Sequence, residues 1–233
     1  MTLNLSLTLC LIFSGACLVI NRPFLEASEK KEYKKALFYK VGSSLCFVAL
    51  SGISVGTKGV GFSDFWLIVT LGLFFGTVGD LLLAFRHFSK RGYELFFTVG
   101  AVAFALEHLS FIGYFLFSNE NIVPITTLAF VVCFAAATFV LAKTRVDAGR
   151  LQIGVYIYIA VVCLTSATAI ATAILTPSIG SLMFALGSLC FVASDTTICV
   201  YNFSEHKEFQ LMILLHYLYS PAQILIALSV LFI

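Results

Sequence analysis

The strongest constraint on this chain is a series of eight continuous apolar runs. Each run is roughly 18–25 residues long, enough for a helix to cross a hydrocarbon core of about 30 Å. Continuous runs indicate helices, whereas alternating residues would indicate the strands of a membrane barrel. We therefore predict an all-α, polytopic membrane protein with eight transmembrane helices, at residues 3–20, 36–55, 64–85, 94–118, 122–141, 151–175, 179–202 and 209–232.

The composition agrees with a chain whose main solvent is lipid. Hydrophobic residues make up 60% of the 233 residues and charged residues 11%, against about a quarter charged in soluble domains. A net charge of +2 is too small to indicate a nucleic-acid partner. No Lys or Arg precedes the first apolar run, which is therefore predicted as a helix rather than a signal peptide. The whole chain, residues 1–233, is predicted to be a single transmembrane domain.

Basic residues predict how the helices are oriented. Thirteen of the 14 Lys and Arg lie in the loops after the first, third, fifth and seventh spans, and Lys58 alone lies on the other side. By the positive-inside rule these four loops face the cytosol, and both termini are non-cytosolic. The basic stretch at residues 22–40 is predicted to be a solvated, partly helical connector.

A short similarity between two segments of the chain suggests an internal repeat. Phe75–Asp80 is matched by Phe191–Asp195, so that the two aspartates are 115 residues apart in a 233-residue chain. Four spans per half give both halves the same orientation, which predicts a parallel 4+4 repeat with halves at about residues 1–118 and 119–233. Such a repeat would bring Asp80 and Asp195 to equivalent, facing positions.

Three acidic residues lie inside the predicted spans, namely Asp80, Glu107 and Asp195. A charge at such depth costs at least about 2.5–3.5 kcal/mol, so it indicates a function unless the group is neutral and bonds between helices. Asp80 and Asp195 lie at matching depths in the cytosolic third of the membrane. Other polar groups follow on neighbouring spans, at His108, His216, Tyr219 and Gln223, and Tyr156 and Tyr158 are candidates to line a pocket.

No nucleotide-binding loop, nucleophilic serine motif or zinc spacing is present, and the seven cysteines lack C-x-x-C spacing. We therefore expect no cofactor and no metal ion, with a mixed Asp and His metal site as the weaker alternative.

Several segments resemble the lysoplasmalogenase family, the YhhN-like membrane proteins with eight helices. The similar segments are Gly79–Leu83, Phe104–Tyr114 with His108, Gly187–Asp195, and Tyr219–Gln223. Glu107 departs from the family pattern, in which the neighbour of the histidine is usually uncharged. The resemblance implies hydrolysis of the vinyl ether bond of single-chain ether lipids, to a fatty aldehyde and a glycerophospho-base. It also implies a location in the endoplasmic reticulum membrane.

The polar residues suit that chemistry. Vinyl ether hydrolysis needs a general acid to protonate carbon, a negative charge to stabilise the resulting cation, and a base for water. We predict Asp80 and Asp195 as the catalytic pair, with either one as the acid, in a site toward the cytosolic leaflet. Residues predicted to position substrate or water are His108, Tyr156, His216, Tyr219, Gln223 and Glu107. Residues predicted to bind the headgroup phosphate are Arg86, Arg91 and Arg145.

Two other functions fit the same pattern. A proton-coupled transporter or channel would use Asp80, Glu107 and Asp195 as a relay. A membrane protein that binds lysolipid without catalysis would use only the apolar pocket. The expected partners are a lysoplasmalogen substrate and membrane lipids, with no nucleic acid and a possible homodimer.

Overall fold

The structure, a computed structural model, describes residues 3–58, 65–88, 92–118 and 122–232. These residues form eight α-helices and no strand, and all eight are long and apolar enough to cross a membrane. The predicted all-helical fold with eight spans is therefore confirmed. The helices are α1 (Leu3–Glu29), α2 (Tyr33–Lys58), α3 (Phe65–Phe85), α4 (Tyr93–Ser118), α5 (Val123–Lys143), α6 (Gln152–Leu175), α7 (Ile179–Phe203) and α8 (Phe209–Ser229). Short 3-10 turns follow α3 and α8 and precede α6, at η1 (Arg86–Phe88), η3 (Val230–Phe232) and η2 (Gly149–Leu151).

The connector expected at residues 22–40 is mostly helical. Helix α1 continues to Glu29 and α2 begins at Tyr33, so that only three residues join them. Ion pairs one helical turn apart hold these charged ends in helical form, at Arg22–Glu26 (3.0 Å) and Glu32–Lys35 (2.7 Å). The hydrogen bond from Lys35 also lowers the pKa of Glu32. The apolar run ends at these charged residues, but ion pairs between neighbouring helical turns continue the helix.

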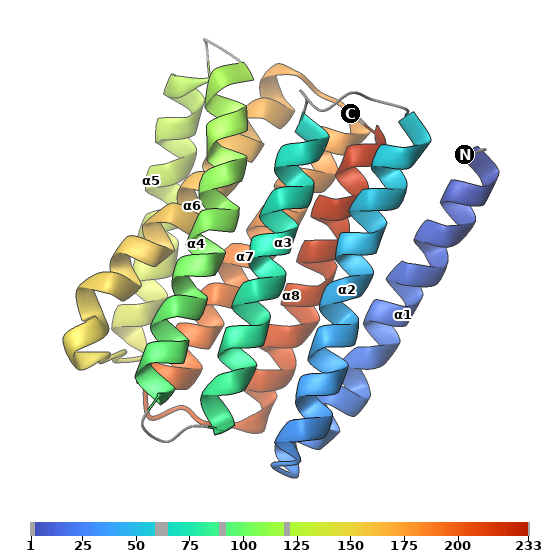
Figure 1. The fold of residues 1–233 in the computed structure, drawn as a ribbon. Coiled ribbons are helices and arrows are strands. Elements are labelled where there is room, and N and C mark those ends of the chain that lie inside the picture. The colour runs from blue at the N-terminus through green and yellow to red at the C-terminus, as the bar shows by residue number, and fades with distance from the viewer. Residues whose placement is uncertain (1–2, 59–64, 89–91, 119–121, 233) are drawn as a thin grey trace.

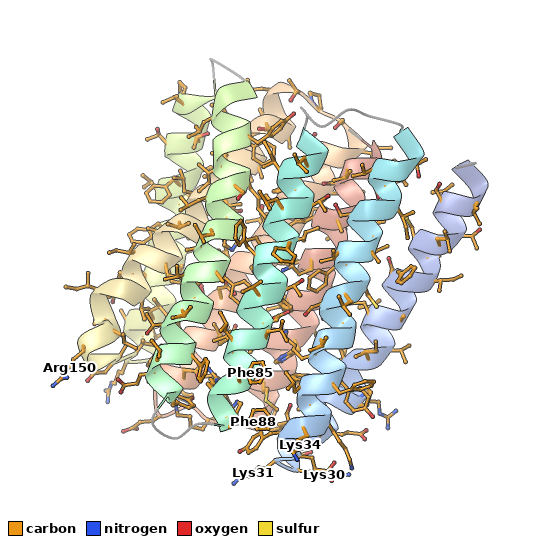
Figure 2. The ribbon with its side chains drawn as sticks, in the orientation of Figure 1. Lys30, Lys31, Lys34, Phe85, Phe88 and Arg150 are labelled. Atoms are coloured by element: carbon orange, nitrogen blue, oxygen red, sulfur yellow. The ribbon has the colours of Figure 1, made fainter. Side chains whose placement is uncertain are left out.

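Consecutive helices pack as antiparallel hairpins: α1 with α2, α3 with α4, α5 with α6, and α7 with α8. Both termini lie at one end of the bundle, and Lys30, Lys31, Lys34 and Arg150 lie at the opposite end (Figures 1 and 2). Helix α4 also packs against α6, and α8 packs against α2. A shift by four helices would exchange these two contacts, while the 4+4 repeat itself stays a prediction.

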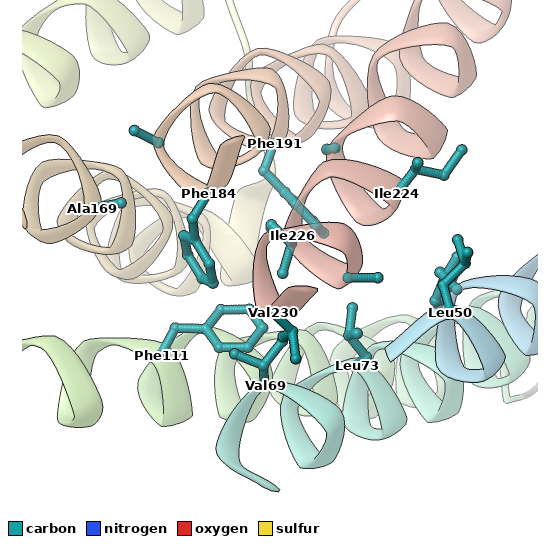
Figure 3. Packing of buried hydrophobic residues seen from close by; sticks show 14 of the residues in the cluster. Leu50, Val69, Leu73, Phe111, Ala169, Phe184, Phe191, Ile224, Ile226 and Val230 are labelled. Carbon is teal, nitrogen blue, oxygen red and sulfur yellow. The ribbon is translucent and has the colours of Figure 1, made fainter. Parts of the chain in front are cut away.

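Buried aromatic and branched side chains from several helices pack into one cluster, part of which Figure 3 shows. Phe111 of α4 and Phe184 of α7 meet edge to face, with ring centroids 5.2 Å apart. Val69, Leu73 and Val230 close the same cluster and are fully buried.

Three glycines let α3 and α4 approach closely. A Cβ atom added at any of them would lie 2.4–2.7 Å from a side chain of α4, a separation that real Cβ atoms do not show. Phe111 therefore packs against Gly72, Glu107 against Gly76, and Phe104 against Gly79. The close approach places Glu107 one helical turn from Asp80 along α3.

Candidate functional site

A cavity of about 500 Å³ lies in the basic half, between all the helices except α5. Its size and mostly apolar lining are typical of a small-molecule site with few polar groups. Asp80 and Asp195 both line it, so the two predicted catalytic residues share one cavity. Lys31 and His87, which are exposed at the basic end, also line it and show where the cavity opens. Among the lining residues with polar side chains are Lys40, Arg86, Tyr158, His216 and Tyr219.

Asp80 on α3 is a buried carboxylate that has a cationic partner. Lys40 Nζ lies 2.9 Å from its Oδ1, while the hydroxyls of Ser44 and Tyr219 donate to its Oδ2 at 2.6 and 2.7 Å. Gln223 Nε2 donates to the Tyr219 hydroxyl at 3.2 Å. The Lys40 ammonium also lies 4.0 Å from the centre of the Tyr219 ring. Helices α2, α3 and α8 thus meet at Asp80.

Asp195 on α7 has different surroundings. Tyr158 of α6 donates a hydrogen bond to its Oδ2, and His108 Nε2 of α4 lies 3.9 Å from the same oxygen. Among the described residues, no Lys or Arg forms an ion pair with Asp195. Asp195 is 6% exposed and Asp80 3%, so the two acids differ in their partners and not in their burial.

Glu107, His108 and Gln223 lie beside the cavity and do not line it. All three are fully buried. Both oxygens of Glu107, both ring nitrogens of His108 and Oε1 of Gln223 have no hydrogen-bond partner among the described residues. The structure therefore places these predicted positioning residues behind the two aspartates.

His216 of α8 lines the cavity as expected. Its Nδ1 donates to the Met212 carbonyl oxygen at 2.8 Å, and its ring centroid lies 4.6 Å from that of Phe24. The backbone hydrogen bond fixes the ring, and it leaves Nε2 as the nitrogen that can accept a proton or a hydrogen bond.

Tyr156 does not line the cavity, whereas Tyr158 does. Tyr156 packs instead against a second cluster of α5, α6 and α7 that includes Leu141 and Ile159. Residues two apart on a helix point about 200° apart, because each residue turns the helix by about 100°. Of the two tyrosines on α6, the structure therefore brings Tyr158 to Asp195.

The predicted phosphate-binding residues lie in different places. Arg86 lines the cavity, and its Nη1 is buried without a hydrogen-bond partner among the described residues. Its guanidinium lies 5.4 and 5.6 Å from the ring centres of Tyr93 and Phe97. Arg145 is exposed and lies outside the cavity lining. Arg91 lies outside the described residues.

Three residues of the site were not predicted from the sequence. Lys40 and Ser44 bind Asp80, and Lys31 lines the mouth of the cavity. A signal for the first two was present, because residues 40 and 44 are one helical turn apart and would share a helix face. Among the described residues, no group of three or more His, Cys, Asp or Glu could hold a metal ion.

Comparison with known proteins assigns the chain to a family. The model of the YhhN family matches residues 35–230, which include every residue of the candidate site named above except Phe24 and Lys31. No curated protein matched the chain, and no solved structure matched it. Because the match covers most of the sequence, from the first turn of α2 to the end of α8, the chain belongs to the YhhN family, which is the lysoplasmalogenase family.

Proposed function

We propose that this protein hydrolyses the vinyl ether bond of lysoplasmalogens. One observation carries the proposal: two buried carboxyl groups line a single, mostly apolar cavity, and only one of them is paired with a cation. This is the arrangement that acid-catalysed hydration of a carbon–carbon double bond requires, with one neutral acid and one stabilising anion. Membership of the YhhN family supports the same reaction.

The lipid would enter from the basic end, where the cavity opens. Its headgroup phosphate would bind Arg86 and Lys31, which line the cavity there. The buried, unpartnered Nη1 of Arg86 is suited to donate a hydrogen bond to a phosphate oxygen. The alkenyl chain would follow the apolar lining past the two aspartates. If the basic loops face the cytosol, this path begins in the cytosolic leaflet of the endoplasmic reticulum membrane.

Asp195 would be the general acid. A carboxyl group in an apolar interior without a cationic partner is more stable as the neutral acid. In the first step its proton moves to the β-carbon of the vinyl ether, the carbon–carbon π bond supplies the electrons, and an oxocarbenium ion forms. Asp195 is then a carboxylate that retains the hydrogen bond from Tyr158.

Asp80 would stabilise the cation and act as the base. Its ion pair with Lys40 and two hydroxyl donors suit a carboxylate. Water adds to the cationic carbon and its proton moves to Asp80, giving a hemiacetal. When the hemiacetal collapses, Asp80 returns this proton to the leaving glycerol oxygen, and Asp195 takes the hemiacetal hydroxyl proton. The products are an aldehyde and a glycerophospho-base, and both acids regain their starting states.

The other predicted residues would act through this pair. Gln223 holds the Tyr219 hydroxyl, and Tyr219 holds Asp80. His108 lies beside Asp195, where it can orient a water molecule. His216 would accept a hydrogen bond from the glycerol hydroxyl or from water at its free Nε2.

The test is aldehyde release by the purified protein in detergent. We would offer alkenyl-lysophosphoethanolamine and alkenyl-lysophosphocholine, with ester lysolipids of equal chain length as controls. We expect aldehyde from the vinyl ethers alone, and its loss in Asp80→Asn and in Asp195→Asn, each checked for folding by thermal unfolding. Full hydrolysis by folded Asp→Asn variants would rule out the acid pair. Inactivity on all substrates, with flux that depends on a proton gradient in sealed vesicles, would favour the transporter instead.

A further inference from the structure

A second polar site lies behind the cavity, on the side away from the basic end. Five of the nine buried side-chain atoms without partners among the described residues belong to Glu107, His108 and Gln223. Buried polar atoms are nearly always hydrogen-bonded, and each one left without a partner costs about 1–3 kcal/mol. Five such atoms on three residues therefore indicate a ligand that the protein atoms do not supply.

Glu107 and Gln223 meet from two helices, and His108 follows Glu107 on α4. The Gln223 amide of α8 lies next to the Glu107 carboxyl group of α4. That carboxyl group lies against the backbone of α3, since a Cβ atom at Gly76 would be 2.4 Å from its Oε2. A bulkier residue at position 76 would occupy this space. The glycine thus gives the Glu107 carboxyl group room against α3, one helical turn from Asp80.

The three side chains are linked to both aspartates. Gln223 donates to Tyr219, which donates to Asp80, and His108 lies 3.9 Å from Asp195. The free atoms include acceptors of Glu107 and Gln223 and a donor of His108, so that they suit a ligand that both donates and accepts. Water is the small ligand with these properties, and a buried water typically makes about three hydrogen bonds.

We infer that Glu107, His108 and Gln223 bind an internal water cluster that supplies the water for hydrolysis. The inference rests on the proposed function. An alkenyl chain in the cavity would fill the access route from the basic end and exclude bulk water. A water store behind the aspartates reaches the reacting carbon from the opposite side. Glu107 is then a positioning residue that acts through bound water.

The first test detects the water without measuring activity. X-ray radiolysis generates hydroxyl radicals from bound water, and these oxidise adjacent side chains even where bulk solvent is excluded. We expect His108, which is fully buried, to be oxidised in the wild-type protein. Oxidation should fall to background in Glu107→Leu and persist in Glu107→Gln, whose amide still binds water. An unlabelled His108 in the wild-type protein would overturn the inference.

The second test measures catalysis with the same variants. In Glu107→Leu we expect kcat to fall about tenfold or more with KM changed less than about twofold, because only the chemical step needs water. Glu107→Gln should keep most of kcat. Thr126→Val is the matched control, since it removes another buried, unpartnered oxygen on α5, outside the cavity lining.

The outcomes separate the two proposals. A wild-type protein that releases no aldehyde contradicts the proposed function, and the labelling still decides whether water is bound. Unchanged kcat in folded Glu107→Leu, with or without loss of labelling, would show that the reaction does not use this water and would overturn the inference.

Discussion

Lys40 of α2 and Asp80 of α3 form an ion pair inside the bundle, with 2.9 Å between Nζ and Oδ1. The side chains are 14% and 3% exposed, so both charges are largely removed from water. Breaking such a pair leaves one buried charge without a partner, which costs roughly 3–5 kcal/mol. The pair therefore matters for stability as well as for the proposed chemistry.

We expect Lys40→Met to lower the thermal unfolding temperature strongly and to abolish aldehyde release. The double variant Lys40→Met with Asp80→Asn removes both charges, so it should recover most of the lost stability. It should remain inactive, because the proposed base is missing. Unfolding of the purified proteins in detergent provides the measurement. A double variant no more stable than Lys40→Met would contradict a direct ion pair.

Tyr158→Phe tests the hydrogen bond to Asp195. Loss of a single hydroxyl donor to the proposed acid should lower kcat about tenfold, equivalent to about 1.4 kcal/mol. Tyr156→Phe is the matched control, because Tyr156 lies two residues away on α6 and outside the cavity lining. Steady-state aldehyde release with both variants gives the comparison. Equal effects at the two positions would contradict the assignment of Tyr158 to the site.

Gly79→Ala tests the close contact between α3 and α4. The added methyl group would lie 2.7 Å from the Phe104 ring, and overpacking of this kind costs about 1–3 kcal/mol. Gly113→Ala is the control, since a Cβ atom there meets nothing within 4 Å. Its stability should change by less than about 0.5 kcal/mol. Thermal unfolding of both variants under the same conditions would show whether only the first is destabilised.

Lys31 and Arg145 allow a matched test of headgroup binding. Both follow the last turn of a helix with positive φ, 57° and 53°, a conformation that glycine adopts without strain. Lys31→Gly should therefore fold well and raise KM about two- to fivefold, the size expected for an exposed charge pair. Arg145→Gly should leave KM unchanged, because Arg145 lies outside the cavity lining.

A substrate without a phosphate provides the control for this comparison. Alkenylglycerol carries the vinyl ether but no anionic group, so Lys31→Gly should not change its KM. An equal rise in KM for alkenylglycerol and for the phospholipid would show that Lys31 affects the shape of the cavity mouth and does not bind the phosphate through its charge.

The fold could be predicted because each span is a continuous apolar run, and only helices satisfy the backbone of such runs in lipid. The end of α1 and the start of α2 could not be predicted in this way. Their charged residues resemble a loop in composition, but ion pairs such as Arg22–Glu26 continue the helix. Asp80 and Asp195 were identifiable for the same reason as the fold, since an acid is conspicuous in an apolar run.

The partners of these acids were harder to predict. Lys40 ends a cluster of lysines that resembles a cytosolic loop, and the packing of α2 against α3 turns it toward Asp80. Helix α6 is apolar on all sides, so the sequence pattern does not show which of Tyr156 and Tyr158 faces the cavity. These assignments depend on how α6 packs against α7 and α4, which is a tertiary property.

The cavity opens at one end of the bundle, among Lys31, Arg86 and His87. For the proposed reaction this placement separates the products by solubility. The glycerophospho-base is released where water is available, while the aldehyde, which keeps the alkyl chain, partitions into the surrounding bilayer. Once the two products occupy different phases they rarely meet again in the site. The position of one opening would thus make hydrolysis directional and deliver a reactive aldehyde to the membrane.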